Sequence, residues 1–306
     1  MTFNTSGQTN LRWDLEDLNT INGNNSAVIG SPVIIQTNNG NAIQFDGVDD
    51  AIQLNTNPLS GVKEFTIEVI FKPSSGGNLE QRFIHLEQDD ENRVLVELRS
   101  ENNKWWLDTF IKSGSSSKTL IDPSITHPSD IWYHAALVYK EGIMEHFVNG
   151  VKELTGEVKY VTVNSGKSSI GVRMNKVSWY KGAIKTLKVT NKALLANELI
   201  VSEVIALNLP ASLRSNNNVE SSGIKVFPVP AADKISVESD FAIDKNTEVN
   251  LWNLAGENVL LKNNEISLKS ANKMEIKRQD IPSGIYYLSI KVNGKIFTKT
   301  LILGDN

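Results

Sequence analysis

The alternation of apolar and polar residues at every second position is the feature that most constrains the fold of this 306-residue chain. The stretch "RFIHLEQDDENRVLVELR" (82–99) shows it on both sides of a polar turn. Ile84 and Leu86 come before the turn, and Val94 and Val96 follow it. A period of two is typical of a strand that packs one face on a core. The stretch predicts two strands joined by a turn, with a polar second face that is a candidate for a binding surface.

Further runs rich in Val, Ile, Thr and aromatic residues recur along most of the chain, separated by Asn, Gly, Ser and Asp. Examples are "FTIEVIFKP", "WYHAALVYK" and "GAIKTLKVT". This spacing predicts an all-β sandwich or jelly roll. One stretch, "ALLANELIVSEVIALN" (193–208), has a helical pattern instead.

A polar segment divides the chain after this predicted helix. Residues 209–223, "LPASLRSNNNVESSG", contain few large apolar side chains, which is typical of a linker. A new β pattern begins at Ile224 and continues almost to the end. We therefore expect a first domain over 1–208 and a second, smaller β-sandwich over 224–306.

The charge and the composition exclude several classes of function. The net charge is −4 and no basic block is present, which argues against nucleic acid as a partner. The chain has no cysteine, so disulfides and thiolate metal sites are excluded. No apolar run approaches the length of a membrane span. The opening residues, "MTFNTSGQTNLRW", lack the pattern of a signal peptide, so we expect no leader within this chain.

Several motifs of the first domain occur in a recognisable order. They are "IQFDGVDDAIQL", "EFTIEVIFKP", "WYHAALVY", "EHFVNGVKE" and "GAIKTLKVTNKALLANEL". Together they resemble the laminin-G-like, concanavalin-A-like jelly-roll family, over roughly residues 10–205. The resemblance implies a jelly-roll sandwich. Because this architecture hosts lectin-like modules, hydrolases and lyases alike, it does not by itself fix a function.

The second domain has its own motifs: "VFPVPAADKISV", "LWNLAGENVL" and "IPSGIYYLSIKVNGKIFTKTLIL". They resemble the C-terminal sorting domain of the type IX secretion system. The matching residues are Pro228, Pro230, Asp233, Gly256, Gly284 and Tyr286, while Val229 stands where the family usually has Asn. The resemblance implies that the protein is secreted or held at the outer cell surface, with the secretion machinery as a partner.

An acidic turn suggests a metal site. Asp46, Asp49 and Asp50 offer hard oxygen ligands in one loop, and such oxygens suit calcium. The alternative is a tight turn in which the Asp side chains accept backbone N–H groups. Lys185 and Thr186 stand where the resembled family usually has an Asp-Glu pair, which argues against calcium. We expect no cofactor, with structural calcium as the alternative.

The polar strand faces carry residue types that bind sugars. Glu97 and Arg99 share one face of a strand, and Trp106 and Asp108 share a face of the next, with Trp105 on the core side. Aromatic rings stack on pyranoses, and Arg pairs with uronate or sulfate. We expect a polysaccharide, anionic in character, on the concave face. The candidate binding residues are Glu97, Trp106, Asp108, His134, Asn175 and Trp179.

Some of the polar residues would also suit catalysis. Eliminative cleavage of a uronate needs a His or Tyr base and groups that neutralise the developing charge. The candidate catalytic residues are His85, Arg99, His146, Arg173 and Tyr180. Three alternatives to a pure binding protein therefore stay open: a polysaccharide lyase, a glycoside hydrolase that uses paired carboxylates, and an adhesin.

Overall fold

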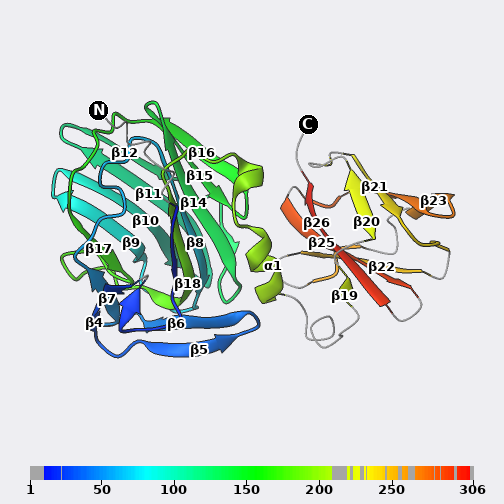
Figure 1. Cartoon of the computed structure of the whole chain (residues 1–306), viewed down its shortest axis with the longest axis horizontal. Coiled ribbons are helices and arrows are strands. Elements are labelled where there is room, and N and C mark those ends of the chain that lie inside the picture. The colour runs from blue at the N-terminus through cyan, green and yellow to red at the C-terminus, as the bar shows by residue number, and fades with distance from the viewer. Residues whose placement is uncertain are drawn as a thin grey trace, which may run out of the picture. The chain divides into compact units, whose positions relative to one another are not determined.

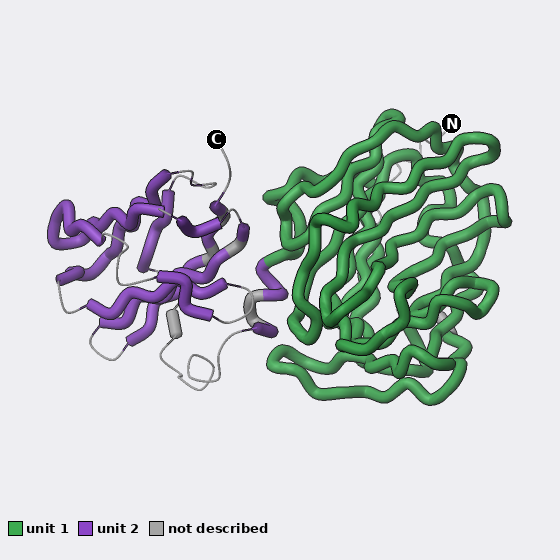
Figure 2. The backbone as a smooth tube through the Cα atoms, turned by 180° about the vertical axis from the view of Figure 1, so that it is seen from behind, with its two compact units in different colours: residues 1–201 green, residues 202–306 purple. Residues whose placement is uncertain are grey.

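The protein forms two compact units, residues 1–201 and 202–306, each built almost entirely of strands (Figure 2). The computed structural model describes residues 10–21, 23–208, 219–220, 223–227, 231, 233–244, 247–253, 257–260, 266–278, 280–282, 284–292 and 295–303. Most of the predicted linker, 209–223, lies outside these residues, and so do Pro228, Val229, Pro230 and Gly256.

Unit 1 is a sandwich of two large sheets (Figure 1). In the first, called sheet I, the strands lie in the order β16-β15-β14-β8-β18-β6-β5, and β1 pairs with β18. All its neighbouring strands are antiparallel. The strands of sheet I are β1 (Asn10–Asp14), β5 (Val33–Thr37), β6 (Gly40–Asp46), β8 (Phe65–Pro73), β14 (Tyr133–Lys140), β15 (Ile143–Val148), β16 (Val151–Glu157) and β18 (Lys181–Thr190).

The second sheet of unit 1, sheet II, has the order β12-β11-β10-β9-β17-β7-β4, and β13 pairs with β11. Its strands are β4 (Ala27–Ile29), β7 (Ala51–Leu54), β9 (Glu80–Asp89), β10 (Asn92–Glu101), β11 (Lys104–Ser113), β12 (Ser116–Ile121), β13 (His127–Pro128) and β17 (Lys167–Ile170). A separate two-stranded ribbon is formed by β2 (Thr20–Ile21) and β3 (Asn24–Asn25).

The core of unit 1 lies between the two sheets and follows the alternation along the strands. The predicted pair of strands within 82–99 is confirmed as β9 and β10, with Val94 and Val96 buried on the inner face. On β11, Trp105 is fully buried in the same core, whereas Trp106 points to the opposite face and is half-buried. The predicted all-β jelly-roll class and the inside–outside assignment of these strands are therefore confirmed.

The turns match the residue types that the sequence supplies. Asn149 and Gly150 join β15 to β16 with φ of 51° and 78°, the positive values that a two-residue hairpin turn requires. A β-bulge follows on β16, where Phe147 pairs with Lys152 but His146 pairs with Leu154. Glu153 is the extra residue, and the bulge turns its side chain toward His127 and His146.

The helix predicted over 193–208 is wrong in its first half. The structure has only a short 3₁₀ helix, Ala196–Glu198, followed by α1, Ser202–Asn208. Side chains of β8 explain the difference. Thr66 donates to the carbonyl of Lys192 and accepts the amide of Leu194, and Glu68 accepts the amide of Ile200. These bonds give the backbone partners outside a helix, so sheet contacts override the local pattern.

Unit 2 pairs two four-stranded sheets around a smaller core. Their orders are β19-β26-β25-β22 and β20-β21-β24-β23. The strands are β19 (Val219–Glu220), β20 (Ile224–Phe227), β21 (Lys234–Ser239), β22 (Glu248–Asn253), β23 (Ile266–Ser270), β24 (Lys273–Lys277), β25 (Gly284–Val292) and β26 (Lys295–Leu303). Tyr286 is buried and donates a hydrogen bond to the carbonyl of Pro282 at 2.8 Å. The predicted small C-terminal β fold is confirmed.

The two neighbouring tryptophans of β11 provide a direct test of the inside–outside assignment. Trp105→Ala should lower the free energy of unfolding by about 3–5 kcal/mol, because it leaves a cavity in the core. Trp106→Ala should cost on the order of 1 kcal/mol, as is usual away from a core. Urea unfolding of both variants at one pH measures the difference. A larger loss for Trp106→Ala would contradict the assignment.

Candidate functional site

The outer face of sheet II gathers charged side chains from adjacent strands. The register pairs Glu97 with Asp108 and Arg99 with Trp106, so these four predicted residues are neighbours. Arg99 donates from Nε to Asp108 Oδ2 at 2.8 Å and also pairs with Glu80, while Arg82 pairs with Glu97. These five charged residues, Glu80, Arg82, Glu97, Arg99 and Asp108, are called the charge network.

The charge network is largely shielded from solvent. The side chains of Arg82 and Glu97 are each 5% exposed, and that of Asp108 is fully buried. Burial and the neighbouring Asp108 raise the pKa of Glu97. Burial also opposes ionisation of Glu80, but hydrogen bonds from Arg99 outweigh it and lower the pKa of Glu80. Three acids face two arginines, so one negative charge is left over when all five groups are ionised, which agrees with the raised pKa of Glu97.

Arg82 joins the charge network through a β-bulge that the sequence pattern does not reveal. Val96 pairs with Ile84, but the next residue, Glu97, pairs with Arg82. Phe83 is the extra residue, and it is buried in the core together with Ile84. The bulge reverses the alternation along β9, so Arg82 and His85 both reach the outer face. Simple alternation assigns only His85 to that face.

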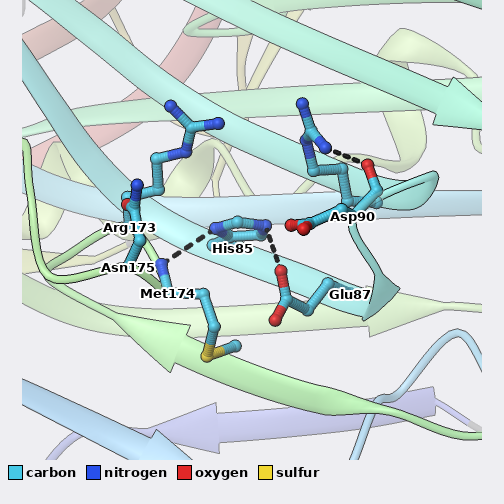
Figure 3. Close-up of a pocket in the computed structure, with 7 residues that line it drawn as sticks. His85, Glu87, Asp90, Arg173, Met174 and Asn175 are labelled. Carbon is cyan, nitrogen blue, oxygen red and sulfur yellow. Dashed lines mark hydrogen bonds and ion pairs between the residues drawn. The ribbon is translucent and has the colours of Figure 1, made fainter.

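Beside the charge network lies a pocket of about 250 Å³ (Figure 3). It brings together three of the predicted residues, His85, Arg173 and Asn175. Its full lining is His85, Glu87, Asp90, Arg93, Arg173, Met174 and Asn175. Arg93 and Asp90 were not among the predicted site residues. Arg93 shares the outward parity of Glu97, which is the signal that would have found it.

The 171–180 loop between β17 and β18 forms one wall of the pocket and is fixed at several points. The backbone amide of Met174 donates to His85 Nδ1 at 3.1 Å. Further along, Ser178 Oγ donates to Glu80 at 3.4 Å, and the amide of Lys181 donates to the side chain of Gln81 at 2.7 Å. The loop is therefore held against β9 along its length, and Arg173 and Asn175 are presented from a fixed backbone.

His85 has a defined protonation state in this arrangement. Because Nδ1 accepts the amide of Met174, the proton of the neutral ring resides on Nε2. Nε2 lies 3.1 Å from Glu87 Oε2 (Figure 3). Burial, together with Arg173 and Arg93, lowers the pKa of His85 to about 3. His85 is therefore neutral near pH 7, and it holds the loop with one nitrogen and presents a donor to Glu87 with the other.

Arg173 differs from the other arginines of this face. Its side chain is half-buried, and its guanidinium has no hydrogen-bond or ion-pair partner within the described part of the chain (Figure 3). Arg93, by contrast, donates to the carbonyl of Asp90 and lies over the ring of Phe110, 5.3 Å from its centroid. Arg173 thus leaves up to five N–H donors directed at the pocket and solvent. Asn175, next to it, is exposed.

Two of the predicted catalytic residues lie elsewhere. His146 pairs in register with the core residue Leu137 and is 1% exposed; its Nδ1 lies 3.1 Å from Thr109 Oγ1 across the sandwich. Tyr180 is fully buried against Phe45 and Phe83. Burial raises its pKa well above the usual value. Neither side chain reaches the pocket, so Tyr180 does not offer a stacking surface for a ligand either.

His134 also has a different environment from the one we expected. It lies on the outer face of sheet I, is fully buried, and its Nε2 is 3.1 Å from Glu68 Oε1. Lys188 and the amide of Ile200 bind the same carboxylate. Burial opposes ionisation of Glu68, but His134 and Lys188 outweigh it and lower the pKa. This cluster fastens the 192–200 segment to sheet I.

Of the predicted binding residues, Trp179 lies on the 171–180 loop and is half-buried.

The predicted acidic turn is present, and its carboxylates are heavily engaged by the backbone. Oxygens of Asp46, Asp49 and Asp50 lie within 4.8 Å of one another, so the cluster could hold an ion. Asp50, however, accepts the amides of Ser31 and Asp46, and Asp46 Oδ1 accepts the amides of Val48 and Asp49. The geometry fits the alternative of a capped turn. Calcium binding by this turn stays a prediction.

Two features define the class of protein: a jelly-roll sandwich with a polar pocket on one outer face, and a small C-terminal β unit. The family comparison agrees. Residues 46–200, about half of the chain, match the model of the concanavalin A-like lectin/glucanases superfamily, and the protein belongs to this superfamily. Residues 225–304 match the secretion system C-terminal sorting domain. That domain indicates a secreted or outer-surface protein that interacts with the type IX machinery.

Solved structures with a similar fold are distant in sequence. Domain 4 of AbnA, an extracellular GH43 arabinanase from Geobacillus stearothermophilus in complex with arabinotriose, is 16% identical with a TM-score of 0.50, covering 64% of this chain and 98% of that one. A heptameric SAP-like pentraxin from Limulus polyphemus is 20% identical (TM-score 0.41; 53% and 80% covered). The receptor-binding domain of botulinum neurotoxin type G is 13% identical (TM-score 0.47; 97% and 78% covered).

The comparison with curated proteins gave no match. No helix in the described ranges is both long and apolar enough to span a membrane.

The burial of His146 predicts a pH-dependent stability. Burial lowers its pKa from 6.5 to about 4, so the unfolded state binds its proton more readily. Stability from this group is fully present above pH 6.5 and falls as the pH drops toward 4, by about 1.4 kcal/mol per pH unit. His146→Gln should remove that slope. Urea unfolding of both proteins between pH 6.5 and 4.5 measures it, and identical slopes would contradict the assignment.

Proposed function

We propose that the protein is an exported glycan-binding protein that holds an anionic polysaccharide at the pocket beside the 171–180 loop. The observation that carries the proposal is the guanidinium of Arg173, which has no partner among the described residues at the mouth of a pocket of about 250 Å³. Arginine binds carboxylate and sulfate groups through paired, charge-assisted hydrogen bonds. A uronate or a sulfated sugar therefore supplies the group that Arg173 lacks.

The remaining lining suits the neutral part of a sugar. Glu87 and Asp90 accept hydrogen bonds from hydroxyls, and the amide of Asn175 both donates and accepts. Met174 adds an apolar contact beside them. A site with a few placed polar groups on a preformed wall is typical of small-ligand binding. The fold is compatible with this role, since the arabinanase domain of the same architecture was solved with arabinotriose.

The state of the candidate bases favours binding over catalysis. A base for elimination needs a free lone pair near the substrate and a suitable pKa. His85 has Nδ1 occupied by Met174 and a pKa of about 3, and His146 and Tyr180 are buried in the core. The carboxylates Glu97 and Asp108 are paired with arginines rather than with each other. We therefore do not propose lyase or hydrolase activity.

The first test removes the unpaired charge. Arg173→Ala should weaken binding to a uronate-containing polysaccharide such as polygalacturonate by roughly 10- to 100-fold, the value of a charge-assisted hydrogen-bonded pair. Lys159→Ala, which removes one exposed positive charge elsewhere on unit 1, is the matched control and should bind as the wild type. Affinity electrophoresis against carboxylated, sulfated and neutral glycans measures the effect. Equal loss in both variants, or no loss in Arg173→Ala, would refute the role of Arg173.

The second test separates a positioning role of His85 from a catalytic one. In His85→Asn the amide oxygen takes the place of Nδ1 and still accepts the amide of Met174, so binding should be retained. His85→Gln and His85→Ala lack an acceptor at the position of Nδ1 and should bind roughly tenfold more weakly, since a partly buried amide is left unpaired. Hydrogen exchange at Met174 reports the loop directly. If His85→Asn binds as poorly as His85→Ala, the positioning role is wrong.

The third test concerns the proposed end of the first domain at residue 208. The pocket lies wholly in unit 1, and the C-terminal unit matches a sorting domain. A chain ending at residue 208 should therefore retain the glycan affinity of the full chain within about twofold, which is less than 0.5 kcal/mol. Calorimetric titration of both chains with the same glycan measures this. A folded but non-binding shorter chain would place part of the site in the second unit.

A further inference from the structure

One margin of the unit 1 sandwich is formed by two edge strands, β5 of sheet I and β4 of sheet II. Both lie within residues 18–45, a stretch that contains no charged side chain in a chain that is 22% charged. Edge strands in natural proteins are usually protected by lysine, by proline within the strand, or by a bulge. β5, with the sequence VIIQT, has none of these, and its register with β6 is regular.

The hydrophobic core is open at this margin. Val28 of β4 pairs with Ile52, and Ile34 of β5 pairs with Ile43; both partners are fully buried core residues. Directly opposite residues share a face, so Val28 and Ile34 also point inward. Yet Val28 is 40% exposed and Ile34 is 44% exposed. Val33, on the other face of β5, is 54% exposed. Two inward-facing side chains thus meet solvent where the sheets end.

At the opposite margin of the sandwich, the two edge strands are covered by another segment of the same chain. There the edge strands β12 and β16 contact each other. The connection after β16 lies across them, with the amides of Lys159 and Val161 bound to Ser116 and Ser113, and Val158 and Val163 enter the core. Both strands also carry charges, including Lys118 and Glu157. The margin at β4 and β5 has no equivalent cover among the described residues.

We propose that a second copy of this chain covers the open margin, with β5 pairing antiparallel to β5 of that copy. A two-fold interface brings each surface against itself, and a charged edge would then oppose like charges. The uncharged 18–45 stretch avoids that repulsion. The pairing satisfies the backbone groups on the outer side of β5, which have no partner strand in the described part of the chain, extends sheet I across both copies, and removes Ile34 from water.

Sedimentation velocity of the full chain over a range of concentrations tests the dimer. The wild type should reach the mass of two chains, and Ile34→Lys should remain at one, a twofold fall. Gln36→Lys places a charge at an exposed polar position of the same strand, where folding is not at risk, and should also give monomers. Val151→Lys, at the exposed start of β16 on the opposite margin, is the control and should dimerise as the wild type does.

Hydrogen exchange of the wild type supplies a second, local readout. Amides of residues 33–37 should exchange more slowly as the dimer forms, while those of β16 should not change. The proposal is overturned if the wild type stays monomeric throughout. It is also overturned if Ile34→Lys and Gln36→Lys both dimerise normally, because the contact then lies elsewhere.

Discussion

The outer face of sheet II depends on the pairing of buried charges. Charged side chains removed from water are stable only when each one is matched by an opposite charge or a hydrogen bond. Arg82 is matched by Glu97, and Arg99 by Asp108 and Glu80. Strand register brings these partners together, and the bulge at Phe83 completes the set. The half-buried guanidinium of Arg173 has no such partner among the described residues, and for that reason the pocket beside the charge network is the best candidate for a ligand.

The four histidines illustrate how residue type alone misleads. His85 holds a loop, and His134 shares the carboxylate of Glu68. His127 and His146 approach Glu153 from different sheets, with Nε2 of His127 at 2.7 Å and Nε2 of His146 at 3.8 Å from its oxygens. The chain has no cysteine and therefore no disulfides, and polar contacts of this kind connect the two sheets instead. Imidazoles that would suit catalysis therefore serve the structure.

The sequence alone predicts the strands, their inward and outward faces and the capped turns well, because alternation and turn residues are local signals. Trp105 inside, Trp106 outside and the Glu97–Asp108 neighbourhood all follow from them. Features that depend on contacts between residues far apart in the sequence are not predicted by these local signals. The bulge that turns Arg82 outward leaves no local signature. His146 is a candidate catalytic residue by its side-chain type, but it pairs with the core residue Leu137 and is buried. The 171–180 loop reaches His85 through a contact across 89 positions of the sequence.

The fixed loop also bears on what the pocket can do. Loops that close over a substrate during catalysis must open again, so few bonds tie them down. The 171–180 loop is instead bound to Phe83, His85 and Glu80. A wall that is already ordered loses little conformational entropy when a ligand arrives, which favours affinity. The same bonds argue against a loop that closes over a ligand to exclude water. A preformed wall, a cation without a partner among the described residues and histidines engaged in structural contacts are the features on which the proposed glycan binding rests.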